Sequence, residues 1–398
     1  MIHKSALRGH FFFIPFVSIL LALNALSIDA YLPAIPTMAE HFSVEISAVN
    51  LTMSFFLVGG AIGQFFGGAL SDQMGRKTLG LAGLAAYSIA ALLIVFAEDM
   101  QQVYGLRLVQ AVGSGLCAVI SMAQVRDVFA AEELQQRYSN MIMVMLVAAL
   151  IAPLLGASLL QLGWQAIFIF IGALGAACFL IYWLFIPETM EATRQKPQFK
   201  RMLRGYKNVV MHRKNNRITA FKFILFSGFS GGIFMSFLTN SASIFMGYFH
   251  LSEYTFALLF GSVSIGLMTG NRLVNRFGKR KPALWVMRFS NAAQIATLSF
   301  LVGALYLGFE SIELVGLSLL VVLVFFGMSG PSATAALMAL FKEDSGSAAS
   351  LNSTFVFGGG ALIGGISTVI SQGQPLPVAS VMLGSAVLGC ITLTQLES

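Results

Sequence analysis

Twelve long apolar runs, separated by charged or turn-forming residues, constrain this sequence more than any other feature. A helix needs about 20 residues to cross the roughly 30 Å hydrocarbon core of a bilayer, and each run approaches or exceeds that length. Charged residues make up 10% of the chain and apolar residues 57%, whereas soluble proteins carry about 25% and about 45–50%. The sequence therefore predicts an all-α membrane protein with twelve transmembrane helices. The runs cover residues 11–32, 48–71, 78–96, 103–123, 140–160, 165–186, 218–244, 253–273, 283–306, 314–340, 348–371 and 378–396.

The longest polar segment lies midway along the chain. Residues 188–217 are rich in Lys and Arg, with only Glu188 and Glu191 opposing them, and they separate six apolar runs from six. We expect a six-helix N-terminal half over residues 1–187, a cytoplasmic basic linker over 188–217 and a six-helix C-terminal half over 218–398.

The Lys and Arg residues indicate the orientation, because those in short loops stay on the cytoplasmic side. With the N-terminus inside, no outward loop carries a Lys or Arg. We therefore expect a multi-pass protein of the bacterial inner membrane with both termini cytoplasmic. The net charge of +7 comes from these scattered loops, so no nucleic-acid partner is expected. Residues 1–30 are similar to a cleavable signal peptide, an alternative that the long apolar run and Asp29 in the cleavage zone disfavour.

A glycine-containing turn with paired charges joins the second and third runs. Residues 68–77 read GALSDQMGRK, in which glycine allows a tight turn and the charges can pair with neighbouring helix ends. The segment resembles the loop signature of the major facilitator superfamily, which implies two pseudo-symmetric six-helix halves and a loop that acts as a conformational switch. The alternative is a basic turn without a role in transport. The matching positions are Gly68, Asp72, Gly75, Arg76 and Lys77.

A weaker copy of this turn lies between the eighth and ninth runs. Residues 273–280 read LVNRFGKR, and Gly278 lies about half a chain after Gly75, as two repeated halves require. Asn275 stands where the first copy has Asp72, so we expect the stronger switching contact in the first copy. Neither glycine is followed by the Lys-Ser or Lys-Thr pair of a Walker A loop, so the sequence does not support an ATP-driven pump.

The fifth run contains Pro153 and Gly156 within residues 152–157, which read APLLGA. A proline inside a helix removes a backbone hydrogen bond and bends the helix, and small residues let a neighbour approach closely. The segment resembles the antiporter motif of the superfamily, although alanines stand where upstream glycines are usual. The resemblance implies export in exchange for another solute. Packing of small residues alone is the alternative.

One acid stands inside an apolar run. Asp29 is the only carboxylate that we place within a span, where a charged side chain costs about 2.5–3.5 kcal/mol and usually marks a functional site. Its context, residues 27–36 (SIDAYLPAIP), resembles the first-helix signature of the Bcr/CflA (bicyclomycin and chloramphenicol resistance) branch of the drug:proton antiporters. Residues 107–115 (RLVQAVGSG), followed by Arg126 and Asp127, match the same branch. The resemblance covers essentially the whole chain.

Asp29 and Arg107 are expected at a similar depth. Asp29 falls in the outer third of the first span, and Arg107 falls about one turn into the fourth. We therefore expect a proton-coupling pair, because an opposite charge favours the ionised carboxylate. In this hypothesis Asp29 binds either a proton or a cationic or polar substrate, and proton entry drives export. The alternatives are that Asp29 is simply solvated near the interface and that Arg107 only braces the bundle.

Polar and aromatic residues near the expected midplane or outer part of the spans are predicted to line the substrate site. They are Asn24, Tyr31, Gln110 and Ser114 in the first half and Phe237, Asn240, Asn352 and Phe355 in the second. No catalytic residue is expected, because no His, Cys and acid gather at one depth. Cys117, Cys178 and Cys390 lack the spacing of a metal site.

The predicted function is proton-coupled efflux of small amphipathic drugs or toxic compounds by alternating access. The expected partners are the small-molecule substrate, protons and the lipid bilayer. We expect a monomer that uses the proton gradient as its energy source and takes no cofactor. A dedicated transporter of one metabolite, such as a siderophore, a sugar or a nucleobase, is the alternative within the same class. A transport-dead sensor or scaffold is the alternative from another class, and an enzyme is not expected.

Overall fold

The computed structural model describes residues 12–129, 131–190, 207, 209–211, 213–214, 217–277, 281–341 and 345–394. In this part of the chain, twelve helical segments are long and apolar enough to cross a membrane, which confirms the predicted number and the helical fold class. The first six contain α2 (Phe13–Asp29), η1 (Leu32–Ala34), α3 (Ile35–His41), α4 (Ile46–Met74), α5 (Arg76–Ile94), α6 (Met100–Val128), α7 (Ala131–Leu160) and α8 (Trp164–Phe185). The second six contain α10 (Thr219–Ala242), η2 (Ser243–Tyr248), α11 (Glu253–Phe277), α12 (Ala283–Tyr306), α13 (Ile312–Met338), α14 (Ser345–Thr354), η3 (Phe355–Gly359), α15 (Gly360–Ser371) and α16 (Pro375–Thr394).

The described helices pack into two compact units. The first contains Met1–Val44 and Phe55–Phe199, and the second contains Glu45–Ser54 and Lys200–Ser398. Helix α4 is therefore divided between the units. Its residues up to Ser54 group with the second unit, and its residues from Phe55 on group with the first. Of the expected linker, residues 191–206, 208, 212 and 215–216 lie outside the described part, so the linker stays a prediction.

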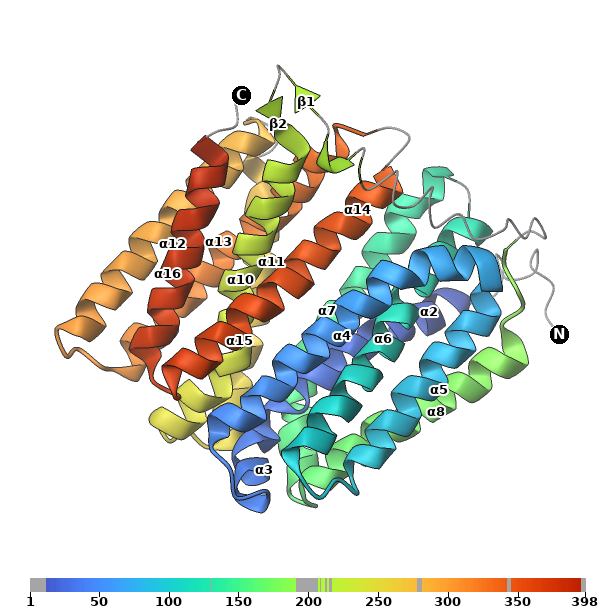
Figure 1. Cartoon of the computed structure of the whole chain (residues 1–398), viewed down its shortest axis with the longest axis horizontal. Coiled ribbons are helices and arrows are strands. Elements are labelled where there is room, and N and C mark those ends of the chain that lie inside the picture. Colours follow the sequence, from blue (N-terminus) through green and yellow to red (C-terminus); the bar gives the residue numbers. More distant parts are fainter. Residues whose placement is uncertain are drawn as a thin grey trace. The chain divides into compact units, whose positions relative to one another are not determined.

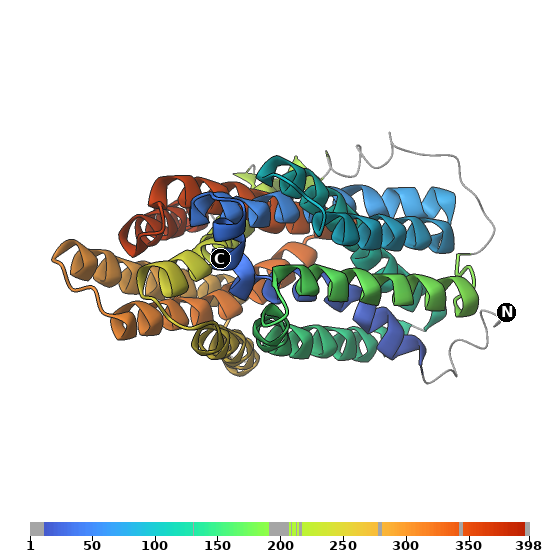
Figure 2. The same cartoon turned by 90° about the horizontal axis from the view of Figure 1, so that it is seen from below.

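Each unit is a helix bundle held by a few extensive contacts (Figures 1 and 2). In the first, α5 packs against both α6 and α8, and α2 packs against α7. In the second, α10 packs against α15 and α16, while α13 packs against both α11 and α12. The buried residues on these faces are mostly apolar, with serines and glycines at the closest approaches. Small residues let helix backbones come close, which is how helices associate inside a membrane.

A short β-hairpin precedes α10. Strands β1 (Arg213–Lys214) and β2 (Arg217–Ile218) pair in antiparallel fashion. This hairpin was not predicted, because two residues are too few to show the alternation by which a strand is recognised.

The α-helix of the first span ends near the predicted boundary at residue 32, and two short helical segments follow it. Helix α2 ends at Asp29, and the chain then turns through η1 before α3 begins. Pro33 lies in the first turn of η1. It lacks an amide hydrogen, and its ring clashes with the carbonyl of the residue four positions earlier, so the α-helix cannot continue through it. That earlier residue is Asp29, so the break places the acid at the end of a helix.

Helix α7 approaches this break very closely. A Cβ atom added at Gly156 would lie 1.9 Å from the carbonyl oxygen of Ala30, so only glycine fits there. Pro153 lies inside the same helix, less than one turn earlier. Gly156 of the expected antiporter motif therefore lies directly against the end of α2.

We predict that Gly156→Ala lowers the free energy of unfolding by about 1–3 kcal/mol, because the added methyl group forces α7 away from α2. The measurement is the thermal unfolding midpoint of the purified protein. Gly105→Ala on α6 is the matched control, since a Cβ there meets no atom within 4 Å. An equal midpoint for both variants would contradict the close approach.

Candidate functional site

Asp29 is enclosed by protein. The residue is 7% exposed and ends α2, directly before the Ala30 backbone against which Gly156 packs. The alternative of a simply solvated carboxylate does not fit this burial. A carboxylate in such surroundings is stable as a neutral acid or with a bound cation, since burial of an uncompensated charge is unfavourable.

Arg107 is the largest side chain in the described structure that is completely buried. Its Nη1 and Nη2 atoms both donate to the Ser27 carbonyl oxygen at 3.2 Å, and Nη1 also donates to Gln110 Oε1 at 3.1 Å. The guanidinium lies 4.6 Å from the ring centre of Tyr31 and 4.4 Å from that of Phe56. Faces of aromatic rings attract cations, and this attraction strengthens when water is absent.

These contacts differ from the expected ion pair, because none of them is with the Asp29 carboxylate. Carbonyl groups in the last turn of a helix have no partner further along that helix, so they are strong acceptors. The fork of a guanidinium can reach such an oxygen with two donors. Arg107 thus holds the end of the helix that carries Asp29, two residues from the acid. The proton-coupling role of the two residues stays a prediction.

The polar residues predicted in the first half do lie near this cluster. Ser114 Oγ donates to Asn24 Oδ1 at 3.3 Å, which joins α6 to α2. Tyr31 is fully buried, and its ring centre lies 5.6 Å from that of Phe168. Gln110 Nε2 is buried and has no hydrogen-bond partner among the described residues. A buried amide donor of this kind is available to a ligand.

The second-half candidates separate into different environments. Asn240 is completely buried, and its amide nitrogen donates to the Ser236 carbonyl oxygen at 2.9 Å while its oxygen accepts from Ser371 Oγ at 3.1 Å. The bond with Ser371 joins α10 to α15, whereas the bond with Ser236 lies within α10. Asn352 lines a cavity of about 210 Å³ and donates to Thr334 Oγ1 at 3.3 Å, and its oxygen has no partner among the described residues.

The two predicted phenylalanines also differ. Phe237 is buried and lines a separate cavity of about 380 Å³. Phe355 begins the π-helical turn η3 and contacts the ring of Phe221 edge-on, with ring centres 6.0 Å apart. Single π-helical turns are frequent at functional sites.

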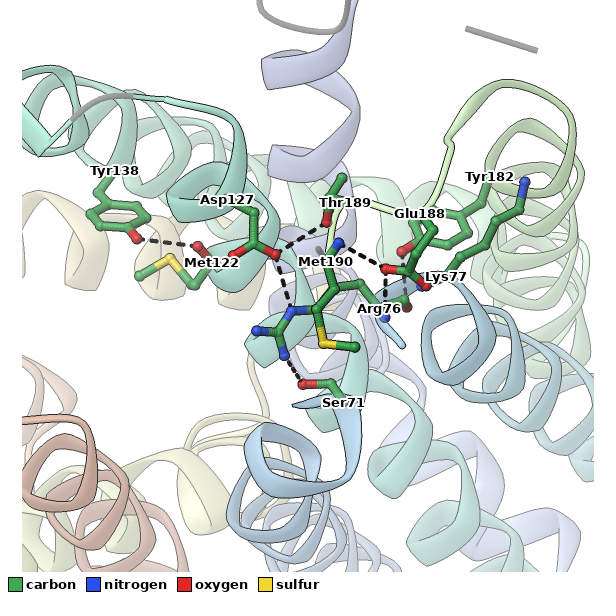
Figure 3. A network of polar contacts seen from close by, with 10 residues as sticks. All are labelled: Ser71, Arg76, Lys77, Met122, Asp127, Tyr138, Tyr182, Glu188, Thr189 and Met190. Carbon is green, nitrogen blue, oxygen red and sulfur yellow. Dashed lines mark hydrogen bonds and ion pairs between the residues drawn. The ribbon is translucent and has the colours of Figure 1, made fainter. Parts of the chain in front are cut away.

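The loop between α4 and α5 forms a polar network (Figure 3). Arg76 Nε makes an ion pair with Asp127 Oδ2 at 3.2 Å, and the Arg76 guanidinium also donates to Ser71. Thr189 Oγ1 donates to the same carboxylate oxygen at 3.2 Å. Asp127 was noted in the sequence only as part of the resemblance, and its contact shows that the loop joins the end of α6. The surroundings of Gly68 and the side chain of Asp72 lie outside the described part of the chain.

Glu188 is the functional candidate that the sequence analysis missed. Its Oε1 accepts from the Arg76 amide and its Oε2 from the Lys77 amide, each at 3.0 Å. These amides open α5, whose N-cap residue, Gly75, has φ of 91° and no side chain to cap the helix. A carboxylate at a helix N-terminus is stabilised by the free amides and the helix dipole. The only sequence signal was an acid directly after the sixth span.

Three further side chains at this end of the first unit donate hydrogen bonds to backbone carbonyl oxygens. Tyr182 donates to the Arg76 carbonyl oxygen at 3.2 Å, and Lys77 Nζ donates to that of Trp183 at 2.9 Å. Tyr138 donates to the Met122 carbonyl oxygen at 3.1 Å. Burial raises the pKa of the Tyr138 hydroxyl above its ordinary value, so this group stays a neutral donor. The corresponding second-half residues 278–280, and the side chain of Asn275, lie outside the described part.

Comparison with known proteins identifies the architecture. A family model for the Major Facilitator Superfamily matches residues 17–365. The chain belongs to the major facilitator superfamily. Solved structures agree in fold: a POT family transporter in complex with 5-aminolevulinic acid gives a TM-score of 0.76 at 14% identity, covering 96% of this chain and 94% of that chain. A D-xylose-proton symporter gives 0.72 at 14% identity, covering 97% of both.

Curated relatives of this major facilitator carry drug-resistance names. A chloramphenicol resistance protein of Pseudomonas aeruginosa is 28% identical over 387 residues, which cover 94% of this chain and 88% of the relative. A bicyclomycin resistance protein homolog of Haemophilus influenzae is 25% identical, covering 98% and 97%. A multidrug transporter, MdfA, of Yersinia pestis is 26% identical over 277 residues, covering 69% and 66%. These names agree with the branch that the residues of the first and fourth spans resemble.

We predict that Glu188→Ala frees the first turn of α5, because two amides lose their acceptor, at a cost of about 1 kcal/mol. Hydrogen exchange followed by mass spectrometry is expected to show faster exchange in the peptide that begins α5. Glu98→Ala, which removes an exposed carboxyl elsewhere, is the control. Unchanged exchange at Arg76 and Lys77 in the Glu188 variant would rule out the capping role.

Arg107→Lys tests whether geometry or charge matters at the buried cation. Lysine keeps the charge but lacks the fork, so we expect a loss of about 2 kcal/mol in unfolding free energy. The comparison is the unfolding midpoint of Arg107→Lys against that of Arg272→Lys, which changes an exposed arginine on α11. Equal midpoints would show that the two bonds to the Ser27 carbonyl contribute nothing.

Proposed function

We propose that this protein exports small amphipathic drugs or toxic compounds in exchange for protons. The observation that carries the proposal is the enclosed carboxylate of Asp29, which ends α2 beside the glycine of the antiporter motif. The names of the relatives support drug export over the single-metabolite alternative. The substrate is a small molecule, and the coupled ion is the proton.

Asp29 is the proposed site of proton exchange. A charged carboxylate enclosed in a membrane protein is unfavourable, so it takes up either a proton or a cationic group of a substrate. Binding of one then excludes the other, which is the requirement for exchange. Arg107 positions the acid by holding the Ser27 carbonyl oxygen, and Gly156 lets α7 respond when the end of α2 shifts.

The loop network is the proposed conformational switch. The ion pair between Arg76 and Asp127, together with the Glu188 cap, fixes the start of α5 in the described state. These contacts are made by side chains with alternative partners in water, so they are suited to separate when the two halves alternate in access. The proposed orientation places this loop and both termini in the cytoplasm, in the inner membrane of a bacterium. We propose a monomer that needs no cofactor beyond the proton gradient.

We predict that Asp29→Asn abolishes pH-gradient-driven export, because an amide cannot exchange a proton. The measurement is chloramphenicol and lipophilic-cation movement in proteoliposomes with an imposed pH gradient. Glu40→Gln on α3 is the matched control, because Glu40 is exposed on the same span and should leave transport unchanged.

Full gradient-driven export by the Asp29 variant would overturn the proposal. Transport of a siderophore, sugar or nucleobase in the same assay, without movement of any drug in the panel, would favour the metabolite alternative. Failure of the wild-type protein to move any solute would favour the sensor or scaffold.

A further inference from the structure

The second unit contains a cavity of about 380 Å³ that the transport mechanism above does not use. It lies among α10, η2, α11 and α13, and Phe237, Phe245 and Val263 are among the residues that line it. Cavities of about 300–1,000 Å³ hold small ligands. Leu317, which also lines the cavity, is 64% exposed, so the cavity opens at the surface of the unit.

The internal repeat explains why a cavity forms there. Helices α4 and α6 cross in the first half through glycines, and α11 and α13 cross in the second half in the same way. A Cβ added at Gly63 or at Gly270 would lie within 2.3 Å or 2.1 Å of a carbonyl oxygen on the partner helix. The matched contacts are Gly63 with Val112 and Gly270 with Val324, then Gly115 with Gly60 and Gly327 with Leu267. One constant shift in numbering relates α4 to α11, and another relates α6 to α13.

These shifts identify the second-half counterparts of two filled positions. In the first half, Tyr104 stacks on Phe55, with ring centres 4.8 Å apart. Their counterparts are Gly316 and Ser262, which both line the cavity. A Cβ at Gly316 would meet no atom within 4 Å. Two stacked rings in one half are thus replaced by a glycine and a serine in the other.

The buried cation is replaced as well. Arg107 lies over the ring of Phe56 in the first half, and their counterparts are Leu319 and Val263, which again line the cavity. The second half therefore keeps the space of a cation and its aromatic neighbour without either group. Two rings, Phe237 and Phe245, still border that space.

Glu313 gives the cavity its charge. The residue is exposed in the first turn of α13 and lines the cavity together with Gly316, Leu317 and Leu320. Spacings of three, four and seven residues place all four on one face of the helix. No Lys or Arg is among the lining residues. An apolar, partly aromatic cavity with a carboxylate and no cation has the chemistry that recognises a lipophilic cation.

We propose that this cavity binds a lipophilic monocation, with its apolar or aromatic groups among Phe237, Phe245 and Val263 and its charge near Glu313. The site lies entirely in the second half, whereas Asp29 lies in the first. Binding at this cavity can therefore be tested independently of the exchange proposed at Asp29.

The test measures binding rather than transport. Full-length protein carrying Asp29→Asn is equilibrated with labelled tetraphenylphosphonium, a lipophilic monocation, or with triphenylphosphine oxide, an uncharged molecule of related shape. We expect the cation to bind more tightly than the uncharged molecule. Gly316→Tyr restores one of the first-half rings in the cavity and should weaken cation binding at least about tenfold. Glu313→Gln should weaken cation binding and leave the uncharged molecule unaffected.

Two matched controls separate the site from general effects. Gly303→Tyr on α12 adds the same ring at a glycine where a Cβ also meets no atom within 4 Å. Glu253→Gln removes an exposed carboxyl from the first turn of α11 that does not line the cavity. Both should bind the cation like the parent. Ser262→Phe adds the other missing ring and keeps the test valid if Gly316→Tyr does not fold.

The proposal is overturned if filling the cavity through Gly316 or Ser262 leaves cation binding unchanged. It is also overturned if the uncharged molecule binds as tightly as the cation and Glu313→Gln has no effect, since the cavity would then be a pocket for lipid tails. Retained cation binding by the Asp29→Asn protein, whose transport is expected to be lost, would support the proposal, because the site does not depend on the exchange at Asp29.

Discussion

A cation that is wholly buried in an apolar protein requires its own chain to supply every partner, and Arg107 organises the first half for that reason. Its contacts come from α2 through the Ser27 carbonyl oxygen, from α4 through Phe56 and from α8 through Phe168. Tyr31 and Gln110 add further contacts to the guanidinium. Four helices are thus fixed around one guanidinium, and the position of Asp29 follows from the helix end that the guanidinium holds.

The two halves share a backbone plan and divide the chemistry. Both cross their second and fourth helices through glycines, yet the first half fills the space beside that crossing with a buried cation and stacked rings. The second half leaves it open and offers a carboxylate at its edge. Duplication of a fold supplies two equivalent positions, and side-chain replacement then gives one a structural role and the other room for a ligand.

Much of this architecture follows from patterns that are local in sequence. Apolar length alone predicts the twelve spans, and the charges in the turn at residues 68–77 predict pairing with a neighbouring helix end, which Arg76 makes with Asp127 on α6. Depth placed Asp29 and Arg107 near one another, but it could not decide which oxygen the guanidinium binds. That choice depends on the end of α2, which Pro33 determines. The predicted run ended at residue 32, directly before Pro33, so the end of the helix was expected but its contact with Arg107 was not.

Contacts between residues far apart in the chain were beyond sequence reasoning. Glu188 caps a helix that begins more than a hundred residues earlier, and no spacing rule joins the two. Asn240 was predicted as a substrate contact because it is polar within a span, and its bond with Ser371 also joins α10 to α15. An amide in a span is compatible with both roles until its partners are known.

The place of the Glu188 cap decides how easily it can open. The two amides that it covers lie at the edge of the apolar spans, where Lys77 is only partly buried. If the carboxylate leaves, water can take its place on both amides. The free-energy difference between α5 with and without the Glu188 cap is therefore small. If the same two hydrogen bonds broke within the hydrocarbon core of the membrane, both backbone amides would be left without partners. Glu188 also stands directly before the basic linker, so its carboxylate joins the start of that linker to α5 at a point where water can replace the bond to the Lys77 amide.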